Sequence, residues 1–296
     1  MKKILFLVLL VVLVTAGGYY WKSSRPRSIP KGKIKVVVSG YVPYTLAKQL
    51  AGDRLDLEML LPPGAEPHGF EPAPGSLVSV HRADAFFYVS DRLEPWVKDV
   101  LGAVGPNTRV VMLASAVSDE TDPHVWMNFD AVRAMAHTLA QSFGELDPAH
   151  APVYLQNLER FETEIKELDK KFSQTLASCE SREMVHIGHL AFGALARRYQ
   201  LELTSLTGSS HDGEHSVRRL AGLVKHIRKR KIHALFTEEA VSPRLAQAVA
   251  VETGTEILPL YTIEHVSKTD FNQSVTYREL MLRNLDNLQR GLVCKK

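Results

Sequence analysis

"AHAPVYLQNLERFETEIKELDKKFSQTLA", residues 149–177, contains no glycine and carries apolar side chains three and four residues apart. This spacing places the apolar side chains on one face of an α-helix. The expected apolar stripe consists of Leu155, Leu158, Phe161, Ile165, Leu168, Phe172 and Leu176. The sequence therefore predicts one long helix in the middle of the chain.

Short apolar runs alternate with helical stretches on both sides of this helix. The runs typical of strands are KIKVVVSGY (33–41), LDLEMLLP (55–62), DAFFYVS (84–90), RVVMLAS (109–115), EMVHIGH (183–189), LELTSLT (201–207), IHALFTEE (232–239) and EILPLY (256–261). Strands that alternate with helices form βαβ units and parallel sheets. We expect an α/β fold of two Rossmann-like lobes with mostly parallel sheets, joined by one long backbone helix. The expected domains are an N-terminal lobe (33–148), the linking helix (149–178) and a C-terminal lobe (180–296).

The composition is that of a globular protein with no marked charge. The chain has 296 residues, of which 45% are hydrophobic, and its formal net charge is +3 from 36 basic and 33 acidic residues. The densest basic run, HIRKRKIH (226–233), is expected at the solvated end of a helix. No basic patch interleaved with aromatic residues indicates a nucleic-acid partner.

The first residues predict export. Lys2 and Lys3 precede an apolar run, Ile4–Val14, and Val14–Ala16 is a plausible cleavage site, so residues 1–22 are typical of a signal peptide. The same segment could remain as a membrane anchor, with Tyr19–Trp21 at the interface. No cysteine follows the run, which excludes lipid attachment there. In an oxidising compartment the two cysteines, at positions 179 and 294, could form a disulfide or stay as separate thiols.

Four metal-ligand side chains follow predicted strands. His68 lies in AEPHGFEPAPGS (65–76), His124 in TDPHVWMNFD (121–130), His189 in VHIGH (185–189) and Glu264 in LPLYTIEHV (258–266). Parallel sheets bind ligands beyond the carboxyl ends of their strands, so these residues, two from each lobe, are expected to meet in an interlobe cleft. Three imidazoles and a carboxylate suit Zn²⁺, with Mn²⁺ and Fe²⁺ as alternatives.

These motifs resemble those of the zinc/manganese ABC-transporter solute-binding proteins, the metal-binding periplasmic binding proteins, and most closely their zinc-specific members. The similarity covers GYVPYTLAKQLAGDRLDLEMLLPPGAEPHGFEPAPGSL (40–77), DPHVWMN (122–128), HLAFGALARRYQL (189–201) and FTEEAVSPRLAQAVAVETG (236–254). The resemblance implies that His68, His124 and His189 are ligands. The family's usual fourth ligand is an aspartate, which is absent here; Glu264 fits a known variant, and His265 or a water are the alternatives.

The resemblance also implies what the protein does. It would be a non-catalytic, monomeric carrier that captures Zn²⁺ in the periplasm or cell envelope and delivers it to a membrane permease driven by a cytoplasmic ATPase. The sequence does not identify that permease. The alternatives are an Mn²⁺ or Fe²⁺ binding protein of the same family, a zinc-dependent hydrolase with an open fourth position, and an adhesin that carries metal.

Other side chains have two interpretations each. Glu238 and Glu239 could hydrogen-bond a ligand imidazole or cap a helix. His186 is expected to be a core histidine rather than a partner of a ligand, and His211 and His215 could collect metal but fit a solvated capping segment better. Trp96 and Trp126 are expected to be packing residues.

Overall fold

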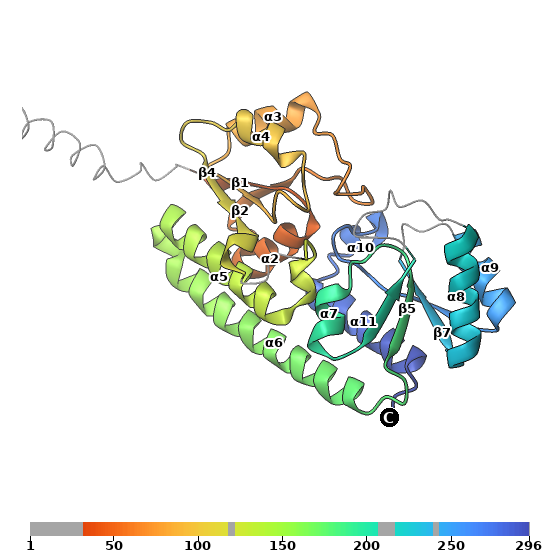
Figure 1. The fold of residues 1–296 in the computed structure, drawn as a ribbon. Helices are drawn as coiled ribbons and strands as arrows, with labels where there is room; N and C mark the ends of the chain where they lie inside the picture. The colour runs from red at the N-terminus through yellow and green to blue at the C-terminus, as the bar shows by residue number, and fades with distance from the viewer. Residues whose placement is uncertain (1–31, 118–121, 207–216, 239–242, 296) are drawn as a thin grey trace, which may run out of the picture. The chain divides into compact units, whose positions relative to one another are not determined.

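The computed structural model describes residues 32–117, 122–206, 217–238 and 243–295 (Figure 1). Residues 34–296 form one compact unit. Among the described residues, no helix is both long and apolar enough to cross a membrane. The predicted signal or anchor segment (1–22), Glu239, His211 and His215 lie outside the described residues.

The N-terminal lobe is built on a parallel four-stranded sheet with the order β2-β1-β3-β4. Its strands are β1 (Ile34–Val38), β2 (Leu55–Met59), β3 (Ala85–Tyr88) and β4 (Arg109–Met112), and its helices are α2 (Tyr41–Ala51), α3 (Pro74–His81) and α4 (Val97–Gly102). Val36 and Val38 point into the main core, whereas Val37 packs in a second apolar cluster on the opposite face. Both faces of this sheet are therefore covered, as expected of a continuous apolar strand.

The C-terminal lobe repeats the same strand order, as β6-β5-β7-β8, again parallel throughout. Its elements are β5 (Glu183–Ile187), α7 (Gly193–Arg198), β6 (Glu202–Ser205), α8 (Val217–Arg230), β7 (Ala234–Thr237), α9 (Pro243–Thr253), β8 (Glu256–Pro259), α10 (Lys268–Asn272) and α11 (Tyr277–Gly291). The predicted α/β fold with two similar parallel sheets is confirmed.

The long helix predicted from the sequence is α6 (Ala151–Ala177), which follows α5 (Phe129–Leu146). α6 contacts α5, α2 of the N-terminal lobe and α11 of the C-terminal lobe, and runs on past the end of α5 (Figure 1). One residue of its predicted apolar stripe was wrong: Leu155 is 52% exposed, and the adjacent Tyr154 is buried instead. Tyr154 packs against Phe143 and donates its hydroxyl to Asp147, which places Leu155 on the solvent side.

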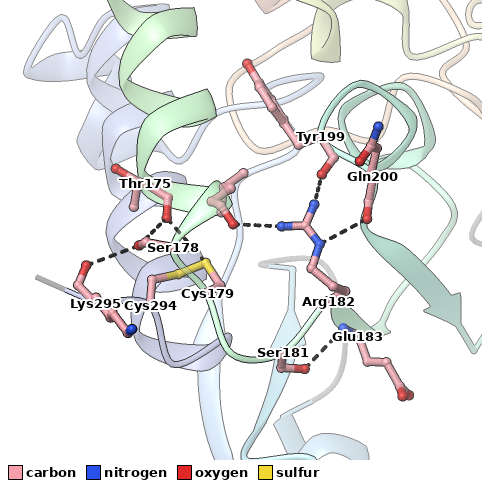
Figure 2. Close-up of a disulfide and its surroundings, with 11 residues drawn as sticks. Thr175, Ser178, Cys179, Ser181, Arg182, Glu183, Tyr199, Gln200, Cys294 and Lys295 are labelled. Carbon is pink, nitrogen blue, oxygen red and sulfur yellow. Dashed lines mark hydrogen bonds between the residues drawn. A yellow bond between two sulfur atoms is a disulfide. The ribbon is translucent and has the colours of Figure 1, made fainter.

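A disulfide joins Cys179, just after α6, to Cys294, just after α11 (Figure 2). Beside it, the Arg182 guanidinium donates to the carbonyls of Leu176, Tyr199 and Gln200. The end of the long helix is thus tied to the C-terminal segment by a covalent bond, and to the start of the second sheet by hydrogen bonds.

Hydrogen bonds that use no candidate-ligand side chain also join the lobes. Arg198 of α7 donates through Nε to Asp169 of α6 at 2.9 Å and through Nη1 to Asp130 of α5 at 2.7 Å. Tyr277 of α11 donates its hydroxyl to the Trp126 carbonyl at 2.7 Å. Because these bonds involve no side chain of a candidate ligand, they join the lobes independently of the candidate site, and they favour small rearrangements over a wide hinge motion.

Candidate metal centre

His68 lies on the proline-rich loop between β2 and α3, and two side chains hold that loop. The Glu66 carboxylate accepts the backbone N–H groups of His68 at 3.0 Å and of Gly69 at 2.9 Å. The Trp96 indole N–H donates to the Pro67 carbonyl at 2.8 Å, from a ring that is almost fully buried. The loop is therefore rigid on both sides of the imidazole.

His124 is fully buried and immediately precedes a 3₁₀ turn, Val125–Met127. Asp122 Oδ1 accepts the His124 backbone N–H at 3.0 Å and lies 3.3 Å from the ring Nδ1. Asp122 Oδ2 in turn accepts from Arg197 of the other lobe at 3.2 Å. A Cβ at Gly193 would lie 2.7 Å from that same oxygen, so glycine at this position lets α7 approach Asp122.

His189 follows β5 and is also fully buried. Glu238, at the end of β7, accepts the His189 backbone N–H through Oε1 at 2.9 Å, and its Oε2 lies 2.8 Å from the ring Nδ1. Of the two glutamates that the sequence singled out, Glu238 therefore holds a histidine, while Glu239 is outside the described residues. His186 is buried, but its Nδ1 also lies 3.1 Å from the His189 carbonyl, so it contacts the backbone of a candidate ligand.

Glu264 lies five residues beyond β8 on a loop that its neighbours constrain, and its side chain is completely buried. The preceding residue, Ile263, has φ of 64°, a left-handed conformation that is rare for a β-branched residue. The Trp126 indole N–H, from the other lobe, donates to the Thr262 carbonyl at 2.7 Å.

Each of these four residues contributes one ligand atom, and the four atoms all lie within 4.8 Å of one another. The His124 and His189 Nε2 atoms are 3.0 Å apart. The Glu264 carboxylate lies 3.3 Å from each of these nitrogens and 3.6 Å from the His68 Nε2. Zinc bonds of about 2.0–2.1 Å in tetrahedral geometry separate ligand atoms by about 3.3–3.4 Å, which is close to these spacings. His265 is not part of this group of four.

The surrounding carboxylates determine which ring nitrogens face the centre. Because Asp122 and Glu238 lie against the Nδ1 atoms of His124 and His189, the Nε2 lone pairs of both rings point toward each other. Burial lowers the pKa of His189, but the carboxylates of Glu238 and Glu264 outweigh it and raise this pKa to about 10. Burial also lowers the pKa of His124, but Asp122 and Glu264 outweigh this effect and raise it. The pocket thus attracts positive charge, either protons or a divalent cation.

The sequence interpretation of the two tryptophans was incomplete. Trp96 and Trp126 are buried, as expected of packing residues, but each indole N–H also holds a loop that carries a candidate ligand. A buried tryptophan needs an acceptor for its N–H, and Trp126 lies only two residues after His124. The nearness of Trp126 to His124 could therefore have suggested a role at the site. The Thr262 carbonyl that accepts its N–H lies 136 residues further along the chain and could not be identified from the sequence.

The fold and the site together define a two-lobe α/β binding protein with a candidate divalent-metal centre between its lobes. The family model for the zinc-uptake complex component A, periplasmic (ZnuA), matches residues 36–291, and the chain belongs to this family.

Individual relatives agree with this assignment. The chain is 29% identical to the high-affinity zinc uptake system protein ZnuA of Bacillus subtilis (strain 168), over 96% of this chain and 95% of that protein. It is 28% identical to the zinc-binding protein AdcA of Streptococcus pyogenes serotype M18, of which it spans 61%. The Zn(II)-bound ZnuA-like domain of Streptococcus pneumoniae AdcA has a similar structure, with a TM-score of 0.77, 27% identity, and coverage of 88% of this chain and 99% of that one.

Proposed function

We propose that this protein is the extracytoplasmic solute-binding component of a metal ABC transporter and that it captures Zn²⁺ between its lobes. The observation that supports this most directly is the convergence of three histidine nitrogens and one carboxylate, whose ligand atoms all lie within 4.8 Å of one another. Membership in a periplasmic zinc-uptake family supports the same conclusion.

In this proposal His68, His124, His189 and Glu264 ligate the ion directly. Three imidazoles and a carboxylate form a donor set suited to Zn²⁺, whereas Mn²⁺ prefers more oxygen ligands. Asp122 and Glu238 hold the rings of His124 and His189 so that Nε2 faces the ion. Partners of this kind are typical of histidines that bind metal and orient them for ligation.

The proposal includes export and delivery. Residues 1–22 would direct the chain out of the cytoplasm as a signal peptide or hold it at the membrane as an anchor. A permease with a cytoplasmic ATPase would receive the ion. The relatives named above are a zinc uptake system protein and a zinc-binding protein. We infer that this chain has no catalytic activity, because a buried Glu264 ligand would occupy the position that a hydrolytic water needs.

Native mass spectrometry with metal analysis tests the proposed function. The chain, purified without chelators or metal-affinity resin, should carry one zinc ion, and His189→Ala should lose it or bind it much more weakly. One manganese or iron ion instead would keep the site but change the cargo. If neither protein bound metal in micromolar zinc, the proposal would be wrong. A Glu264→Ala protein that hydrolysed esters faster than wild type would favour the hydrolase.

A further inference from the structure

Trp126 connects the two lobes at the metal centre. Its ring is fully buried and lies against His124, with ring centroids 5.4 Å apart. Its indole N–H crosses to the C-terminal lobe and donates to the Thr262 carbonyl at 2.7 Å, two residues before Glu264. One side chain thus contacts a candidate ligand of the N-terminal lobe and holds the loop that carries a candidate ligand of the C-terminal lobe.

The loop that carries Glu264 needs such support. Ile263 adopts φ of 64°, and a left-handed backbone costs a residue with a Cβ about 1–2 kcal/mol. Strained residues persist only where their surroundings hold them in place. Asn284 of α11 provides one such support, because its amide accepts the Tyr261 N–H at 2.7 Å and donates to the Tyr261 carbonyl at 2.9 Å. Between Tyr261 and Glu264, the Thr262 carbonyl is held by the Trp126 indole N–H.

We propose that Trp126 is a positioning residue for the fourth ligand: its indole N–H, reaching across the lobe interface, places the Glu264 carboxylate on the metal ion. This inference rests on the proposed function. Without the N–H, Ile263 can relax and Glu264 moves away from the three imidazoles, which remain on supports of their own at Glu66, Asp122 and Glu238. Loss of this bond therefore removes one ligand rather than the whole site.

Trp126→Phe tests the role of the N–H, because phenylalanine keeps an aromatic ring and leaves the Trp126 backbone carbonyl for Tyr277. Loss of a residue that orients a metal ligand costs about tenfold or more in affinity. We expect the variant to bind Zn²⁺ about tenfold more weakly and to release it faster to a chelator. With Co²⁺ as the probe, its visible spectrum should change, because a neutral water in place of the Glu264 carboxylate alters the ligand field.

A double-mutant cycle with Glu264→Ala separates positioning from general stability. If Trp126 acts through Glu264, Trp126→Phe should change neither affinity nor spectrum in the Glu264→Ala background. Tyr154→Phe is the matched control, since it also removes one hydrogen bond of a buried aromatic residue, here to Asp147, in a region without candidate ligands. It should lower thermal stability and leave metal binding unchanged.

Three results would overturn the inference. An unchanged Co²⁺ spectrum and zinc affinity in Trp126→Phe would show that the N–H does not position a ligand. Equal losses in the wild-type and Glu264→Ala backgrounds, or an equal loss in Tyr154→Phe, would show an effect of general stability. If the wild-type chain bound neither ion, the proposed function would fail as well, so the two failures are distinguishable.

Discussion

Glu238→Gln should weaken zinc binding by changing which nitrogen of His189 carries the proton. In the structure, Glu238 Oε2 lies 2.8 Å from Nδ1, and a carboxylate oxygen at this position favours the tautomer with the proton on Nδ1 and the Nε2 lone pair free for the metal. Glutamine can still accept the His189 backbone N–H through its oxygen, as Oε1 does now at 2.9 Å. Its NH₂ group would then face Nδ1 and favour the tautomer with the proton on Nε2.

The size of the effect follows from the burial of this contact. Both side chains are completely buried, and a hydrogen bond to a charged group contributes about 1.5–3 kcal/mol. At about 1.4 kcal/mol for each factor of ten, this range corresponds to a loss of about 10- to 150-fold in affinity. Losses of about 10- to 100-fold are typical for residues that orient a metal-binding histidine.

Competition titrations with a zinc chelator of known affinity would measure this loss. Glu183→Gln is the matched control, because Glu183 holds His226 at 2.8 Å on the same lobe but outside the candidate site. We expect Glu183→Gln to leave the zinc dissociation constant unchanged. If Glu238→Gln bound zinc as tightly as wild type while remaining folded, the proposed role of Glu238 in orienting His189 would be refuted.

Three further outcomes are expected. Gly188→Ala should weaken zinc binding in the same titration, because the new Cβ would lie 2.2 Å from Oε1 of Glu238, which holds His189. Gly222→Ala is the control and should leave zinc binding unchanged, because its Cβ would have no neighbouring atom within 4 Å. Replacing Cys179 and Cys294 by serine should lower the free energy of unfolding by about 4–5 kcal/mol, measured by denaturant titration, because the disulfide closes a loop with a sequence separation of 115; an unchanged midpoint would contradict this. Burial raises the pKa of Glu94 from 4.5 to about 7, so the protonated carboxyl stabilises the fold fully below pH 4.5. As the pH rises through 7 this stabilisation is lost, and the free energy of unfolding should fall by about 3 kcal/mol between pH 4.5 and 8. Glu94→Gln should remove this fall, and identical pH profiles for the two proteins would refute the prediction.

Burial of the candidate site has a consequence for ion capture. His124, His189 and Glu264 have no exposed side-chain surface, whereas the His68 side chain is 12% exposed. His68 is therefore the candidate ligand nearest to solvent. Since the interlobe bonds of Arg198 and Tyr277 involve no ligand side chain, an entering ion needs local movement of the loops more than separation of the lobes.

Much of the fold was predictable because it depends on local periodicity. Short apolar runs predicted the strands of both sheets, and apolar residues three and four apart predicted α6. The error at Leu155 marks the limit of this reasoning. Tyr154 continues the spacing of the buried residues, packs against Phe143 and donates its hydroxyl to Asp147, whereas the adjacent Leu155 is exposed.

By itself, the sequence determined the α/β class, the two similar lobes, the long helix and the three histidines of the candidate site; it left the fourth ligand open between Glu264, His265 and a water, and the structure groups Glu264 with the histidines. The features that the sequence determined depend on short-range patterns, since parallel strands always present their carboxyl ends at one edge. Only the tertiary structure decided that Glu238 holds His189, that Cys179 pairs with Cys294, and that Trp126 reaches Thr262. Each of these contacts joins residues 49 to 136 positions apart, and chain folding rather than local spacing brings such partners together.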